Sequence, residues 1–155
     1  MRTLLIASLL FATACTDERA DLIGSYNTTL SLTIVRGDGS TRAFASSDVS
    51  VLVSENGDDN AVSLSAFATR GASVDCGIFM VAVDDTLAKD TSYSGSSDCL
   101  VCDELRTDCW NVDTDAATGT LVGEQFTLTT SGAARHSTVL DEGTASATLA
   151  GQRAH

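Results

Sequence analysis

Four cysteines in the middle of this 155-residue chain have spacings that disulfide, redox or metal chemistry could use: Cys76, Cys99, Cys102 and Cys109. A structural zinc site made of cysteines uses two closely spaced pairs of ligands. Here six residues separate Cys102 from Cys109, and Cys76 lies far upstream. The spacing therefore predicts no metal at these cysteines, and no other pattern in the chain predicts a cofactor.

The Cys99-Leu-Val-Cys102 stretch has the spacing of a thioredoxin-like redox motif. Such a motif lies near a βαβ pattern, which the surrounding sequence lacks. Three acidic residues also crowd the pair: Asp98, Asp103 and Glu104. A reactive thiolate needs positive neighbours, so we interpret the four cysteines as structural disulfides.

Four cysteines can pair in three ways. A chain-entropy estimate gives about 6 kcal/mol in total for Cys76–Cys99 with Cys102–Cys109, and about the same for Cys76–Cys109 with Cys99–Cys102. Entropy therefore does not select between these two. A bridge within Cys-x-x-Cys closes a very tight ring that is more typical of redox motifs, so geometry favours the first pairing while the second stays open.

Two triplets of acidic or amide residues repeat every second position, as in calcium-binding loops: Asn56, Asp58 and Asn60, and Asn111, Asp113 and Asp115. Calcium loops need a glycine at the sixth position and a bidentate glutamate at the twelfth. Alanine stands at the sixth position of both stretches, and phenylalanine or valine at the twelfth. We attribute these residues to turns and predict no metal there.

His136 is the one histidine in the interior of the chain, and Trp110 is its single tryptophan. No Gly-x-Ser-x-Gly elbow accompanies His136, although folding could still bring a serine and a carboxylate to it. We expect an exposed histidine at the end of a strand, with a hydrolase as the alternative. We expect Trp110 to pack against the disulfides instead of forming a stacking platform for a ligand.

The elements that must position these residues read as strands, because apolar residues recur with a period of two and not of 3.6. Gly37-Asp38-Gly39 and Asn56-Gly57 mark turns between such runs, Gly123 marks a bulge, and residues 141–143 mark a last turn. The expected strands are residues 30–35, 41–47, 49–54, 62–66, 78–83, 120–130, 136–140 and 144–152.

About eight short strands in one chain predict an all-β fold, stapled by disulfides. We expect an antiparallel β-sandwich, with a small β-barrel as the alternative. The strand at residues 78–83 is apolar throughout and should be central. Residues 98–106 are the one helix candidate, with Asp98 as its N-cap. Residues 25–155 form a single domain in this interpretation.

The first residues predict export from the cytoplasm. Arg2 is followed by about ten apolar residues, which have the proportions of a secretory signal and are too few to span a bilayer, since spanning takes about 20. The stretch Ala12-Thr13-Ala14-Cys15 satisfies the small-residue rule for signal cleavage. It also resembles the lipobox of bacterial lipoproteins, although Ala12 stands where that family more often has leucine.

This resemblance implies a signal peptide over residues 1–14, a diacylated Cys15 and a tether over residues 15–24. Cysteine arithmetic supports it, because lipid on Cys15 leaves an even four cysteines for disulfides. The family's inner-membrane retention signal is an aspartate directly after the cysteine. Thr16 stands there instead, so the resemblance favours the outer membrane.

Net charge limits the partners. Without Arg2, eight basic residues face twenty-one acidic ones, a net charge of −13. Nucleic-acid binding depends on Lys and Arg, so we predict no nucleic-acid partner. The expected function is that of a lipid-anchored envelope protein, a non-enzymatic module that binds a protein or a glycan or serves structurally. The alternative is an envelope hydrolase that uses His136.

Overall fold

The structure, a computed structural model, describes residues 19–57, 61–83, 86–89 and 98–155. Strands dominate these residues, and no helix among them is long and apolar enough to cross a membrane. The strands are β1 (Gly24–Arg36), β2 (Thr41–Glu55), β3 (Ala61–Arg70), β4 (Ser73–Val83), β5 (Thr86–Ala88), β6 (Asp98–Cys102), β7 (Cys109–Val122), β8 (Gln125–His136) and β9 (Glu142–Arg153).

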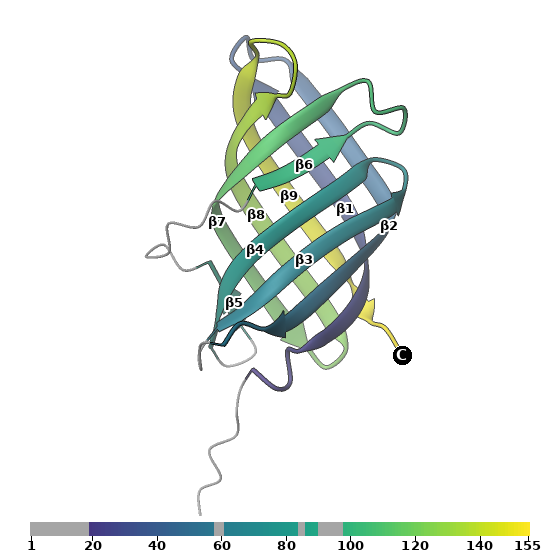
Figure 1. The fold of residues 1–155 in the computed structure, drawn as a ribbon, viewed down its shortest axis with the longest axis vertical. Coiled ribbons are helices and arrows are strands. Elements are labelled where there is room, and N and C mark those ends of the chain that lie inside the picture. Colours follow the sequence, from purple (N-terminus) through teal and green to yellow (C-terminus); the bar gives the residue numbers. More distant parts are fainter. Residues whose placement is uncertain (1–18, 58–60, 84–85, 90–97) are drawn as a thin grey trace, which may run out of the picture.

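The strands form a closed antiparallel barrel (Figure 1). β1 to β4 pair in sequence order, and so do β7 to β9. β9 pairs with β1 from Tyr26 opposite Arg153 to Arg36 opposite Gly143, which closes the wall. The all-β, antiparallel prediction is confirmed, and the barrel alternative is the architecture found. The preference for a sandwich was wrong. Apolar and polar residues alternate in the same way in the strands of a sandwich and of a barrel, so this alternation does not show that β9 pairs with β1.

Two short strands share one place in the wall. β5 pairs with the end of β4 and β6 with its beginning, and both pair with β7 on their other side. Nine strands in the described residues therefore fill eight positions of the barrel. β6 and the turn after it replace the helix predicted over residues 98–106, because Val101 and Cys99 face the core with a period of two.

Several strand boundaries differ from those expected. Residues 41–54 form one strand, β2, with a register shift against β3 between Asp48 and Val49. Residues 120–130 are two strands, because Gly123 adopts a left-handed φ of 62° and turns the chain. β8 ends at His136, and residues 137–141 form the loop that was expected at 141–143. Left-handed φ values at Gly39 and Gly57 agree with the turns predicted there.

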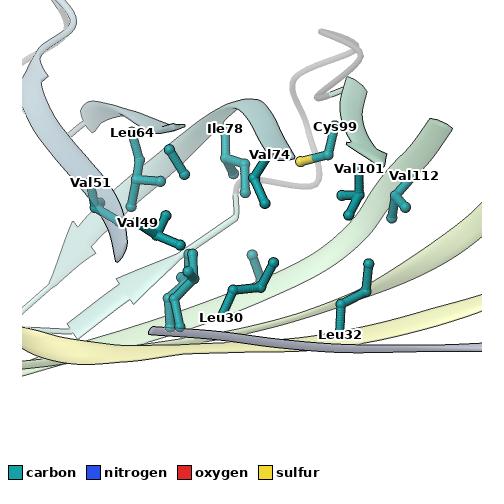
Figure 2. Packing of buried hydrophobic residues seen from close by; sticks show 14 of the residues in the cluster. Leu30, Leu32, Val49, Val51, Leu64, Val74, Ile78, Cys99, Val101 and Val112 are labelled. Carbon is teal, nitrogen blue, oxygen red and sulfur yellow. The ribbon is translucent and has the colours of Figure 1, made fainter. Parts of the chain in front are cut away.

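Inward-facing apolar side chains fill the barrel. In β1, Tyr26, Leu30, Leu32 and Ile34 are buried and alternate with exposed polar residues such as Ser31. Figure 2 shows side chains from opposite walls meeting in this core. At the expected central strand, Ile78 and Met80 of β4 point inward and are buried.

Candidate functional site

Loops gather at one end of the barrel, which we call the loop end: residues 37–40, 71–72, 103–108 and 137–141. The other end is closed by residues 19–23, and we call it the Leu22 end. Figure 1 shows the loop end at the top and the N-terminal segment at the bottom. The polar side chains that could do chemistry concentrate at the loop end.

Trp110 is the centre of the loop end. Its ring is fully buried, and its Nε1 donates a hydrogen bond of 2.7 Å to Asp108 Oδ1. The His136 ring stands edge-on to it at 5.2 Å between centroids, and the Arg36 guanidinium carbon lies 5.5 Å from the ring centroid. β7 and β8 set this arrangement, because Trp110 and His136 are directly paired residues. Trp110 therefore seals the core beneath a polar rim.

His136 is held by partners on both ring nitrogens. Nε2 lies 3.2 Å from Asp108 Oδ1, and Nδ1 accepts the backbone N–H groups of Thr138 and Val139, each at 3.2 Å. With Nδ1 as an acceptor, Nε2 is the ring nitrogen that faces the Asp108 carboxylate as a donor. The side chain is 11% exposed, so the expectation of an exposed histidine was wrong. As placed, the ring offers neither nitrogen to a substrate.

Ion pairs surround Trp110 and His136. Arg42 Nε lies 3.4 Å from Asp108 Oδ2, and Arg36 Nε lies 3.1 Å from Asp141 Oδ2. The Arg36 contact is an ion pair without hydrogen-bond geometry, since its buried Nε has no acceptor at an acceptable angle. Arg135 and Glu142 form a more exposed pair at 3.7 Å, and such surface pairs contribute little to stability. Arg36, Arg42 and Arg135 at the loop end thus lie against carboxylates of the same chain.

The loop over residues 103–108 is ordered around one carboxylate. Asp103 accepts hydrogen bonds from the Thr107 amide and hydroxyl at 2.6 and 2.7 Å and from the Asp108 amide at 3.0 Å. The Cys102–Cys109 disulfide closes the loop at its base. Hydrogen bonds from the Asp108 amide and from Thr107 hold the pKa of the Asp103 carboxyl below its ordinary value.

We expect the order of this loop to be lost in acid. Because the pKa of Asp103 is lowered by folding, its contribution is present above the unfolded value of about 3.9 and is lost as pH falls through the lower folded value. Amide signals of Thr107 and Asp108 should therefore shift in an NMR titration below about pH 4, and Asp103→Asn should abolish this shift. Asp75→Asn, on the outer face of β4, is the control and should leave the titration intact. An unchanged Thr107 signal in the parent protein would contradict the assignment.

An open hollow of about 780 Å³ lies between the β1–β2 and β8–β9 loops. His136, Arg135 and three carboxylates, those of Asp38, Asp141 and Glu142, line it. Leu140 at its rim is fully exposed. The lining of the hollow therefore combines charged side chains with the apolar side chains of Val139 and Leu140.

The barrel interior holds only a small cavity of about 30 Å³, lined by residues that include Leu30, Leu32, Ile78, Cys99 and Val112. Figure 2 labels these five residues and shows their side chains pointing into the core from facing walls. Sites for small molecules enclose about 300–1,000 Å³. Side chains therefore fill the described interior, and the surface of the loop end is the larger recess.

The predicted disulfides are confirmed, and so is the favoured pairing. Cys76 bonds Cys99, and Cys102 bonds Cys109. Each bridge joins two directly opposed residues of neighbouring strands, so β6 is fastened to β4 on one side and to β7 on the other. Cys15 and the predicted signal peptide lie outside the described residues.

One of the two acidic triplets does not lie in a turn as expected, whereas Asn56 of the other lies in the predicted turn beside Gly57. Asn111, Asp113 and Asp115 lie on β7 and alternate with buried residues, so attributing them to a turn was wrong. Asp58 and Asn60 lie outside the described residues. No group of three or more His, Cys, Asp or Glu residues in the described ranges is arranged to hold a metal ion.

Sequence reasoning missed three residues of the loop end: Arg36, Asp108 and Asp141. Folding brings Arg36 of β1 to Trp110, and it brings Asp108, which lies two residues before Trp110 in the chain, to His136. Asp141 in turn pairs with Arg36. Turn chemistry could have indicated Asp103, since aspartate side chains commonly bond to amides that follow them in the chain.

Residues 19–23, which precede β1, close the Leu22 end. Leu22 is 1% exposed, and its carbonyl accepts a 2.6 Å hydrogen bond from the Tyr26 hydroxyl. Arg153 donates to the Asp21 carbonyl and, at 3.1 Å, to the Tyr26 hydroxyl. Burial raises the pKa of Tyr26, and the charge of Arg153 opposes that rise. Residues 19–23 were expected in the tether, but they are part of the fold.

Comparison with protein-family models, with curated proteins and with solved structures finds no match to this chain.

Proposed function

We propose that this protein is a lipid-anchored protein of the bacterial cell envelope, held by acyl chains on Cys15. The pairing of the cysteines is the observation that supports it most. Cys76–Cys99 and Cys102–Cys109 use four of the five cysteines. Cys15, directly after a signal-like stretch, is the one that remains. Disulfides also persist in oxidising compartments such as the periplasm.

The barrel in this proposal is a non-enzymatic module that binds a protein or a glycan, or serves structurally. Its packed interior favours recognition at the surface. At the loop end, charged side chains and the exposed side chains of Val139 and Leu140 line the hollow together. Disulfides and internal ion pairs hold the adjacent loops, and a preorganised surface loses less entropy on binding.

A hydrolase that uses His136 is the weaker alternative. The 3.2 Å contact between His136 and Asp108 resembles the base–carboxylate pair of a catalytic triad. A base must also present its second nitrogen to the nucleophile, and here the Thr138 and Val139 amides bond to it. Hydrolysis would therefore require the 137–141 loop to open.

The anchor is tested by the intact mass of protein extracted from membranes. We expect a chain that begins at Cys15 and carries added acyl mass, located in the outer membrane after fractionation. Cys15→Ala should release the protein in soluble form or leave the precursor uncleaved, because the acceptor thiol is gone. Thr13→Ser, which keeps the cysteine and a small residue, is the matched control. A mature chain that starts at an unmodified Cys15 would refute the proposal.

A further inference from the structure

The folded part of the chain begins very near Cys15. Only residues 16–18 separate Cys15 from Arg19, the first described residue. The Arg19 carbonyl accepts hydrogen bonds from the amides of Leu22 and Ile23 at 2.9 and 3.1 Å. Leu22 is then buried in the barrel end, where Tyr26 and Arg153 bind this segment. Almost no free chain remains between the lipid-bearing position and the barrel.

The tether is shorter than the barrel. An extended chain spans at most about 3.6 Å per residue, so the four steps from Cys15 to Arg19 reach about 14 Å. Trp110 and Val122 lie at opposite ends of β7, twelve residues apart. At about 3.3 Å per residue and a strand tilt of about 40°, they are separated by about 30 Å along the barrel axis. The loop end therefore cannot reach a surface that holds Cys15 unless the barrel lies on its side.

Two features oppose a barrel lying on its side. The mature chain would carry a net charge of −13, so an anionic lipid surface repels it. This repulsion favours the orientation of the barrel in which the fewest acidic residues lie near the lipid. Phe67 and Leu100 are exposed on one flank, at 48% and 41%. Asp75 lies opposite both of them on β4, and lipid contact there would desolvate its carboxylate at a high cost in free energy.

We infer that the Leu22 end faces the phospholipid headgroups of the membrane that carries the anchor, and that the loop end points away from them. This inference rests on the proposed function, because it needs lipid at Cys15. It assigns the surface around Trp110 and His136 to partners that approach from the side away from that membrane.

The single tryptophan allows a direct test. The mature chain is coupled through Cys15, the one cysteine outside the two disulfides, to a maleimide-bearing phospholipid in vesicles of phosphatidylethanolamine and phosphatidylglycerol with dansyl-labelled headgroups. Energy transfer to dansyl is measured from Trp110 in the parent chain. It is then measured from the Leu22 end in the variant Trp110→Phe with Val122→Trp, where Val122 is 75% exposed and accepts a larger side chain.

Transfer from position 122 should be at least about fivefold more efficient than transfer from Trp110, given their separation of about 30 Å along the axis. Inserting twenty Gly/Ser residues after Thr16 should bring the two efficiencies closer together, because the barrel can then turn over. Equal transfer from both positions with the native tether would overturn the orientation. If the variant fails to fold, Val122→Trp alone, which keeps Trp110, replaces it: its transfer should exceed that of the parent chain, and equal transfer would overturn the orientation. Chemical coupling keeps this result separate from natural acylation, which the mass of the extracted protein reports.

Discussion

Replacing Gly151 with alanine should destabilise the barrel strongly, although the change adds only one methyl group. A Cβ at this position would lie 2.0 Å from the Asn27 carbonyl oxygen and 2.6 Å from the Thr28 Cα. Both are backbone atoms of β1, the strand with which β9 closes the wall. The clash is therefore relieved only if the closing strands move apart. Overpacking costs about 1–3 kcal/mol and sometimes more, and we expect about 3 kcal/mol or more.

Thermal and urea unfolding, followed by circular dichroism, measure this effect. A loss of about 3 kcal/mol lowers the melting temperature by about 6–12 °C for a chain of this size. Gly77→Ala is the matched control, because a Cβ there meets no atom within 4 Å. Alanine at that position should be neutral or stabilising by up to about 1 kcal/mol, since glycine loses more entropy on folding. Similar stabilities of the two variants would refute the role given to Gly151.

Removing both disulfides should free β6 before the rest of the barrel unfolds. β6 has five residues, and covalent bonds hold it to β4 and to β7. The chain-entropy model assigns about 3.4 kcal/mol to Cys76–Cys99 and about 2.4 kcal/mol to Cys102–Cys109. Together they are a large share of the 5–15 kcal/mol typical of a domain. Replacing each pair by alanine, and then both, should give losses near these values.

Hydrogen exchange at single amides shows which strands lose their structure when the disulfides are removed. Amides of β6 and of the 103–108 loop should lose protection first in the variant without bridges, while those of β8 and β9 keep it. The β8–β9 ladder does not depend on either bridge, because it runs from Gln125 opposite Gln152 to Arg135 opposite Glu142. The parent protein after mild reduction is the control and should show the same order. Simultaneous loss of protection in β6 and β9 would mean that the barrel opens as one unit.

Local patterns in the sequence predict the walls of this fold but not their closure. Alternation places Leu30, Leu32 and Ile34 on the inner face, as the structure has them. Two structures can share this alternation, since a sandwich and a barrel both bury every second residue. A glycine at a close approach, such as Gly132 against the Asp113 carbonyl, indicates that another strand lies near. Its residue type does not show which strand that is. A glycine can also end a strand, as Gly123 does here.

The candidate site was predictable only in part, for the same reason. Residue type marks Trp110 and His136 as unusual in this chain. Arg36 comes from the distant strand β1. Asp108 lies two residues before Trp110 and Asp141 five residues after His136, but their residue type does not distinguish them from the many other acidic residues. Disulfide pairing was easier, because ring size limits the choices for cysteines close together in the chain.

The pairing of the first strand with the last constrains when this protein can fold. β1 begins at Gly24 and β9 ends at Arg153, so a chain that emerges from its N-terminus completes its first strand long before the partner exists. Until then β1 presents an unpaired edge, which is a hazard for aggregation. Contacts so distant in sequence also form slowly. The barrel therefore cannot close before β9 has been synthesised, and a truncated chain that lacks β9 would keep two open edges.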